Sequence, residues 1–203
     1  MRKLLATSLL PYAKLRNALR PGLRILMYHR VAQLAAYDQL TVSPARFAQQ
    51  MEELARHEVV SLEDGLRALQ SGPLRKPLFA VTFDDGYLDN LTEALPVLQR
   101  YQIPATIFVT TQFCDQAISH PRYGSQSAQR LHLDWDEVAA LARAPGITIG
   151  SHTLTHPYLP TISDTLAQQE IATSRTVIAS HLNRAVDYFC YPSGDLSARE
   201  LRL

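Results

Sequence analysis

The stretch L-F-A-V-T-F-D-D-G-Y, from Leu78 to Tyr87, joins an apolar run to two adjacent carboxylates and a glycine. The run from Leu78 to Phe83 is of the kind found in strands that are buried on both faces of a parallel sheet. If the strand continued, Asp84 and Asp85 would point to opposite faces, and one would enter the core. Gly86 permits a turn, so we expect both carboxylates to face one mouth of the fold.

Similar short runs recur along the chain, with helix-period segments between them. The other predicted strands are Leu23 to Tyr28, Val59 to Leu62, Ala105 to Thr110, Ile147 to Ser151 and Tyr188 to Tyr191. Capping residues mark helix starts at Ser43-Pro44, at Ser61 with Asp64, and at Asp134 with Glu137. This alternation predicts an α/β fold with a parallel sheet, either doubly wound or closed as a barrel.

Composition limits the function classes. The chain has 203 residues, of which 46% are hydrophobic and 19% are charged, which suits one globular domain. The formal net charge of +1 provides no basic field, so we expect no nucleic-acid partner. The two cysteines, Cys114 and Cys190, are far apart in the sequence and are interpreted as free thiols.

The N-terminal segment, residues 1–22, is basic and amphipathic. Its apolar run from Leu4 to Leu10 is short and is followed by Pro11 and basic residues, so it does not fit a cleavable signal peptide. We expect a helix that packs on the domain or makes peripheral contact with a membrane surface, and a cytoplasmic or membrane-peripheral location. Residues 23–203 are assigned to one domain. The segment from Gln112 to Arg130 is interpreted as a long surface loop.

Polar residues follow the ends of the predicted strands, where parallel α/β folds place their chemistry. His29 ends the first strand, Asp84 and Asp85 end the third, and Ser151-His152 ends the fifth. Like charges held together raise one pKa unless a cation compensates, so the acidic pair favours a metal. His152 and His156, spaced i, i+4, would lie on one side of a helical turn. Two imidazoles and a carboxylate suit zinc, cobalt, nickel, iron or manganese.

Three ordered motifs resemble a known family. T-F-D-D-G-Y (82–87), I-G-S-H-T-L-T-H-P (149–157) and F-C-Y-P-S-G (189–194) are similar to the first three motifs of the polysaccharide deacetylases, the NodB-homology or carbohydrate esterase family 4 group. L-M-Y-H-R-V (26–31), I-P-A-T-I-F-V (103–109) and L-D-W-D-E-V (133–138) add supporting matches. The resemblance covers most of the chain from residue 23 onward.

The resemblance implies a distorted (β/α) barrel and the metal-dependent removal of acetyl groups from an N-acetylated glycan. Carried over by position, Asp84 is the general base, and Asp85, His152 and His156 are the ligands of a divalent transition metal. Zinc is the first expectation, with cobalt, nickel, iron or manganese as alternatives. The backbone N–H of Ser193 would help to stabilise the oxyanion. The oligomeric state is left open.

Four further residues are candidate substrate contacts: Tyr87, Trp135, Tyr158 and Pro192. Tyr87 and Tyr158 flank the two main motifs and could line a sugar subsite, with packing as the alternative role. Trp135 is expected beside the site or as a core residue at its helix start. The remaining histidines, His57, His120, His132 and His181, are expected at the surface or at helix ends.

Two departures from the family pattern matter. Cys190 stands where many members have an arginine that orients the catalytic carboxylate, and Ser193 stands where they have an aromatic residue. The sequence also ends at Leu203, before the leucine-histidine motif that supplies the family's general acid, so we expect a barrel that is incomplete at its C-terminal end. His29 is the candidate substitute for the acid. The alternative to an enzyme is a noncatalytic, truncated deacetylase-like protein that retains metal or glycan binding.

Overall fold

The computed structural model describes residues 20–118, 120–122, 130–194 and 196–202. The predicted N-terminal helix therefore lies almost wholly outside the described residues. Within the described part, no helix combines the length and apolar character needed to cross a membrane.

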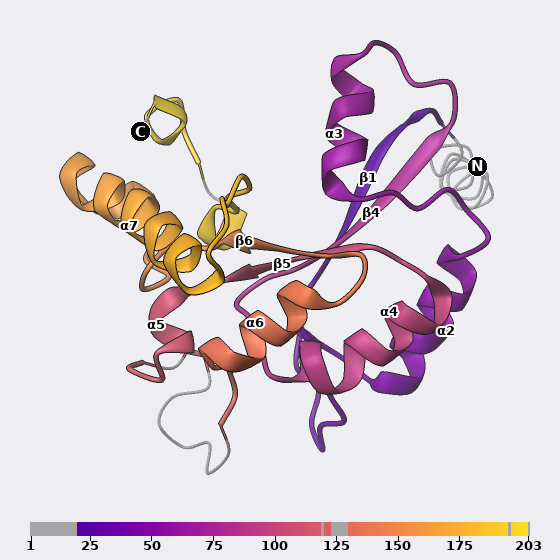
Figure 1. Cartoon of the computed structure of the whole chain (residues 1–203), viewed down its shortest axis with the longest axis horizontal. Coiled ribbons are helices and arrows are strands. Elements are labelled where there is room, and N and C mark those ends of the chain that lie inside the picture. The colour runs from indigo at the N-terminus through magenta and orange to yellow at the C-terminus, as the bar shows by residue number, and fades with distance from the viewer. Residues whose placement is uncertain (1–19, 119, 123–129, 195, 203) are drawn as a thin grey trace, which may run out of the picture.

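A four-stranded parallel sheet forms the centre of the molecule, in the order β1-β4-β5-β6 (Figure 1). Its strands are β1 (Gly22–Tyr28), β4 (Pro77–Phe83), β5 (Ala105–Val109) and β6 (Ile147–Ser151). Tyr28 pairs with Phe83, and Phe83 pairs with Ile107. The carboxyl ends of neighbouring strands therefore lie at one edge of the sheet, as the sequence predicted. A short parallel pair, β2 (Arg30–Val31) and β3 (Thr41–Val42), follows β1.

Helices connect the strands. They are α2 (Pro44–Leu54), α3 (Leu62–Gln70), α4 (Leu95–Tyr101), α5 (Thr111–Cys114), α6 (Trp135–Arg143) and α7 (Asp164–Leu182). A π-helical turn over Asn90–Ala94 precedes α4, and 3₁₀ turns span Leu159–Thr161, Pro192–Gly194 and Glu200–Arg202. Figure 1 shows α2, α4 and α6 along one side of the sheet and α7 next to β6.

The predicted helix starts are confirmed by their capping hydrogen bonds. The Ser61 hydroxyl accepts a hydrogen bond from the Asp64 N–H at 3.0 Å, and Ser43 caps α2 in the same way. Asp134 and Glu137 form a complete capping box. Side-chain oxygens at these positions satisfy backbone N–H groups that have no partner inside the helix, so the helices begin where the sequence predicted.

Two predicted strands are shorter than expected. From the run Val59 to Leu62, only Val59 forms a bridge, with Phe79, because Ser61 already caps α3. The run Tyr188 to Tyr191 makes one bridge, between Phe189 and Ser151, flanked by the hydrogen bonds Ser151 N–H to Tyr188 O and Cys190 N–H to Ser151 O, each 2.9 Å long. This contact extends the edge of β6 and brings residues 190–194 to the carboxyl ends of the strands.

The predicted loop from Gln112 to Arg130 also differs from expectation. Its first residues belong to α5, whose Phe113 is fully buried, and residues 119 and 123–129 lie outside the described part of the chain.

A continuous apolar core lies between the sheet and the helices. Phe47 and Met51 of α2, Phe83 of β4 and Ile107 of β5 are all fully buried. The rings of Tyr28, Phe47 and Phe83 pack within 5.2–5.8 Å of one another at the carboxyl ends of β1 and β4. Burying each such side chain contributes about 1.5–3 kcal/mol, so the strand ends are held by packing as well as by the sheet ladder.

Candidate active site

A tight turn follows β4 and carries both acidic residues. The Asp84 N–H donates to the Tyr28 carbonyl at 2.9 Å, which extends the sheet by one residue. Asp85 and Gly86 then adopt positive φ angles of 71° and 67°, and these reverse the chain direction. A Cβ atom at Gly86 would lie 3.0 Å from Val109 Cγ1, so both the backbone angle and the available space favour glycine. The expected turn is therefore present, and both carboxylates line one cavity.

The two carboxylates are deeply buried. Asp84 is 4% exposed and Asp85 is 1% exposed. Burial raises the pKa of Asp84 to about 6, against the opposing effect of the Cys190 thiol. Burial, and then the Asp84 charge, raise the pKa of Asp85 to about 7, while the Tyr87 hydroxyl lowers it. Among the described residues, neither Asp85 oxygen accepts a hydrogen bond of normal geometry. Such a buried pair is costly unless a cation neutralises it.

Residues Ser151–Pro157, which we call the histidine loop, bring two imidazoles to Asp85. The predicted helical turn is wrong: His156 has φ 60° and Thr153 has φ 70°, angles that an α-helix does not contain. The loop nevertheless brings the rings together. The Nε2 atoms of His152 and His156 lie 3.5 and 3.3 Å from Asp85 Oδ1.

The protonation of His152 follows from its hydrogen bond. Its Nδ1 lies 2.8 Å from the carbonyl oxygen of Cys190, and a carbonyl can only accept, so Nδ1 carries the proton. Nε2 therefore presents a lone pair to Asp85. Burial, and then the charge of His156, lower the pKa of His152 to about 3, so the ring is neutral at pH 7. A neutral imidazole whose second nitrogen donates to a carbonyl is the usual form of a metal-binding histidine.

These residues fit a divalent transition metal. Metal bonds of about 2.0–2.2 Å separate two ligand atoms by at most about 4.4 Å, and both His–Asp85 distances fall within that limit. The Asp85 oxygens accept no hydrogen bond of normal geometry from the described residues and are hard, anionic ligands. Burial also lowers the pKa of His156, and two neutral imidazoles suit zinc and its neighbours in the first transition row.

Two histidines near Asp85, His120 and His132, were expected from the sequence at the surface or at helix ends. His120 Nε2 lies 3.8 Å from Asp85 Oδ2, and ligand atoms of Asp85, His120 and His156 lie within 4.8 Å of one another. His132 is almost fully buried between the rings of Tyr87 and Phe113, at 4.7 and 4.4 Å between centroids. The apolar neighbours on both sides of His132 are the sequence signal that could have indicated its burial. His120 has no such signal.

His132 connects the acidic turn to His120. The His120 N–H donates to His132 Nε2 at 3.4 Å, so the His132 proton lies on Nδ1, which is 3.3 Å from the Asp85 carbonyl oxygen. His120 Nδ1 in turn accepts from the Arg122 N–H at 3.2 Å. A neutral His120 therefore carries its proton on Nε2, the atom that faces Asp85.

A cavity of about 420 Å³ contains the acidic pair and both histidines of the histidine loop. His29 and Ser193 also line it, from the end of β1 and from the turn Pro192–Gly194 within the third motif. Burial, and then the charge of His156, lower the pKa of His29. The structure thus brings together six predicted site residues: Asp84, Asp85, His152, His156, His29 and Ser193. Their roles remain predictions.

Comparison with known proteins identifies the family. Residues 71–203 match the family model described as Polysaccharide deacetylase. The chain belongs to the polysaccharide deacetylase family. It is 28% identical over 183 residues to YxkH of Bacillus subtilis (strain 168), covering 89% of this chain and 60% of that relative. It is 27% identical over 143 residues to the poly-beta-1,6-N-acetyl-D-glucosamine N-deacetylase of Escherichia coli (strain K12), covering 68% of this chain and 21% of that relative.

Solved structures show the same fold. Streptococcus pyogenes deacetylase PplD, in complex with acetate, superposes with a TM-score of 0.76 at 27% identity, over 90% of this chain and 79% of that one. IcaB from Ammonifex degensii gives a TM-score of 0.72 at 25% identity, with the same coverage of 90% and 79%. The expected polysaccharide deacetylase fold, an α/β fold of the distorted barrel type, is therefore confirmed.

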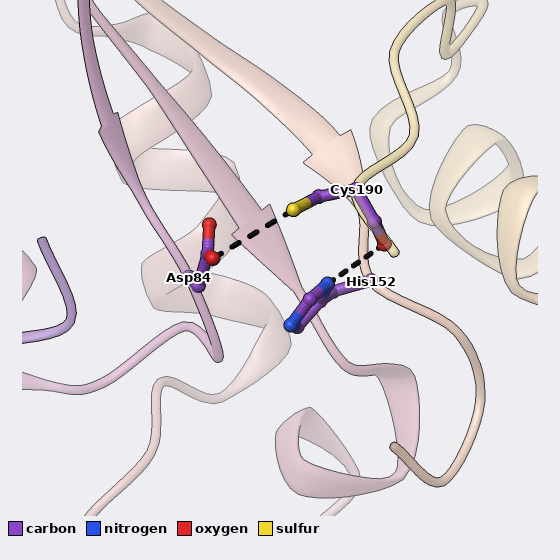
Figure 2. A group of neighbouring side chains, drawn as sticks. All are labelled: Asp84, His152 and Cys190. Atoms are coloured by element: carbon purple, nitrogen blue, oxygen red, sulfur yellow. Dashed lines mark hydrogen bonds between the residues drawn. The ribbon is translucent and has the colours of Figure 1, made fainter. Parts of the chain in front are cut away.

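Cys190 stands at the position where the family resemblance implies an arginine in many members. Figure 2 shows its thiol directed at Asp84, with Sγ 3.6 Å from Oδ2, while its carbonyl oxygen accepts the His152 hydrogen bond. Burial and the Asp84 charge raise the pKa of the thiol, so it stays protonated and donates. Cys190 is a free thiol, as predicted, and it contacts the Asp84 carboxylate from this position.

The four predicted substrate contacts do not line the cavity. Tyr87 is fully buried, stacked on His132 and beneath the Arg30 guanidinium, so it cannot touch a glycan. Trp135 stacks on His181 with centroids 3.9 Å apart, because it starts α6 and faces α7.

Pro192 and Tyr158 also lie outside the lining of the cavity, although they differ in exposure. Pro192 is buried, whereas Tyr158 is exposed and precedes a 3₁₀ turn. The side chains that line the cavity beside the acidic and imidazole groups include Met27, Leu40, Pro121 and Arg122.

Proposed function

We propose that this chain is a metal-dependent hydrolase that removes N-acetyl groups from an acetylated polysaccharide or oligosaccharide. The observation that carries the proposal is the Asp85 carboxylate, which is buried between the imidazoles of His152 and His156 and next to a second acid, and which accepts no hydrogen bond of normal geometry from the described residues. Family membership and two relatives support it. One relative is named for poly-beta-1,6-N-acetyl-D-glucosamine, and the other was solved with acetate, the product that this reaction would release.

Asp85, His152 and His156 would hold the metal, with zinc as the first expectation and cobalt, nickel, iron or manganese as alternatives. A divalent metal held there would supply Lewis-acid chemistry toward the acetyl carbonyl and would lower the pKa of water. The Nδ1–H bond of His152 to Cys190 O holds its ring in the orientation that such a ligand needs.

Asp84 would accept the proton of the attacking water. The Oδ2 atom of Asp84 accepts a hydrogen bond from the Cys190 thiol. Its buried Oδ1 has no hydrogen-bond partner among the described residues and would accept the proton. A base is most effective when its pKa lies near the working pH, and burial raises the pKa of Asp84 toward that range. Asp84 and Asp85 thus have separate roles, although they are adjacent in the sequence.

Two other cavity residues would complete the reaction. His29 lines the cavity and would deliver a proton to the leaving amine. Ser193, at φ 61° in the turn Pro192–Gly194, would contribute its backbone N–H to the oxyanion. Preformed donors of this kind are worth on the order of 10² to 10³ in rate.

The test is acetate release from N-acetylglucosamine oligomers by the zinc-loaded protein. Asp84→Asn should lower the rate by at least about 10³-fold while metal content and unfolding temperature stay unchanged, because it removes only the proton acceptor. Asp136→Asn, an exposed change on α6, is the matched control. If the wild-type chain folds cooperatively and holds stoichiometric metal but releases no acetate from any acetylated glycan, the hydrolase proposal is wrong. The noncatalytic binding protein would then be favoured.

A further inference from the structure

Helix α7 contacts the histidine loop at two points one helical turn apart. At the start of the loop, the hydroxyls of Ser174 and Ser151 share a 2.6 Å hydrogen bond. Within the loop, the carboxylate of Glu170 accepts the backbone N–H groups of Leu154 and Thr155, each at 2.9 Å, and the Thr155 hydroxyl at 2.8 Å. Both N–H groups lie in the segment between the two imidazoles that face Asp85.

The opposite side of the loop is held by the chain that follows β5. The Thr110 hydroxyl donates to the His152 carbonyl at 3.0 Å, and the Gln112 N–H donates to the Leu154 carbonyl at 3.0 Å. The carbonyl groups of the histidine loop thus accept hydrogen bonds from the chain after β5, while two N–H groups of the same loop donate to Glu170. A charged acceptor forms shorter and stronger hydrogen bonds than a neutral one.

The loop needs such restraint because its backbone is strained. Thr153 has φ 70°, which is unfavourable for a β-branched residue, and His156 has φ 60°. Conformations of this kind cost of order 1–3 kcal/mol each and persist only where the surroundings enforce them. Without the carboxylate, the two N–H groups would lose their acceptor and the segment could relax toward ordinary angles. The spacing of the two imidazoles depends on that segment.

We propose that Glu170 is a positioning residue that sets the metal affinity of the site by fixing His152 relative to His156. The inference rests on the proposed function, since it assumes that these imidazoles bind a metal. Glu170 would act through the loop backbone and would not itself be a ligand. Outer groups that orient metal ligands typically change metal affinity 10–100-fold when they are removed.

The test compares zinc affinity, measured by competition with a chromophoric chelator, in wild type, Glu170→Ala and Glu170→Gln. Glu170→Ala should raise the zinc Kd by about 10–100-fold. Glu170→Gln should give a smaller increase, because the amide oxygen still accepts a hydrogen bond without the charge. Gln169→Ala, the exposed neighbour on α7, is the matched control and should change the Kd less than about 2-fold.

Two further measurements separate positioning from a purely structural role. The visible absorption of the cobalt-loaded protein should change in Glu170→Gln, since the ligand geometry changes, while the thermal unfolding of the metal-free protein should stay close to wild type. A zinc Kd and a cobalt spectrum that are both unchanged in Glu170→Ala and Glu170→Gln would overturn the inference alone. Failure of the wild type to bind zinc would overturn the proposed metal site, and the inference with it.

Discussion

The cavity has two parts that are built differently. Its floor, which we define as Asp84, Asp85 and His152, follows strands β4 and β6 of the sheet and is 1–4% exposed. The backbones of Asp84 and His152 continue the sheet through bonds to Tyr28 O and Val109 O, each 2.9 Å long.

The rim, which we define as His29, His120 and Ser193, stands on connecting segments. The His120 backbone is held by the His132 side chain, and Ser193 lies in an exposed turn with φ 61°.

This difference indicates that the floor and the rim contribute to the site in different ways. The floor positions follow from the sheet, so the placement of Asp84, Asp85 and His152 is set wherever the sheet forms. The rim positions depend on single side-chain contacts, which can vary without affecting the sheet. We therefore expect substitutions in the floor to abolish metal binding or chemistry, and substitutions in the rim to have graded effects.

The largest effect is expected from His152→Ala. It removes a buried ligand and leaves Asp85 with fewer partners, so metal retained after dialysis should fall from near one equivalent to a small fraction. Metal analysis by mass spectrometry measures this, with the exposed His57→Ala as the control. Equal metal content in wild type and His152→Ala would refute the assignment of the floor.

His29→Ala should have the next largest effect. Loss of a general acid typically costs on the order of 10² to 10⁴ in rate, and His29 is the proposed proton donor. Acetate release should therefore fall by about 10²-fold or more, with metal content unchanged. Full turnover by His29→Ala would show that the leaving amine takes its proton from another group.

His120→Ala tests the boundary between floor and rim. Since His120 Nδ1 accepts the Arg122 N–H, its Nε2 carries the proton and cannot bind a metal in that state. We expect unchanged metal content and about a 10-fold or smaller loss of rate, typical of a lost hydrogen-bond donor. If His120→Ala loses its metal as completely as His152→Ala, His120 is a ligand and belongs to the floor.

The smallest effect is expected from Cys190→Ala. The thiol is a weak donor to Asp84, so its removal should cost about 0.5–1 kcal/mol, or 2–5-fold in rate. Cys190→Ser should retain more activity than Cys190→Ala, because a hydroxyl can also donate to Asp84. A loss as large as that of Asp84→Asn would mean that the thiol does more than orient the base.

The sequence predicted the parts of the site that follow local rules. Asp84 and His152 could be placed because parallel strands end at one edge, and the helix starts could be placed because capping residues act within one turn. His120 and His132 could not be placed in this way. Their positions arise from contacts with Asp85 and Tyr87, which are more than thirty residues away in the chain.

Contacts between residues far apart in the chain also determine the backbone of the histidine loop and the position of Tyr87. The i, i+4 spacing of His152 and His156 indicated a helical turn, but hydrogen bonds from α7 and from the chain after β5 hold the backbone at angles that local propensity disfavours. Tyr87 was a candidate for a sugar subsite, with packing as the alternative, and the reversal at Gly86 directs its ring into the interior beside His132. In both cases tertiary contacts override the local pattern.

Because the strands are parallel, the two ends of the sheet have different roles. Every floor residue follows the carboxyl end of a strand. The turn over residues 71–76, which is mostly exposed, leads instead into the amino end of β4. An epitope tag or an immobilisation handle inserted in this turn would lie one strand length from the chemistry. The protein could therefore be attached to a surface there with its cavity facing outward.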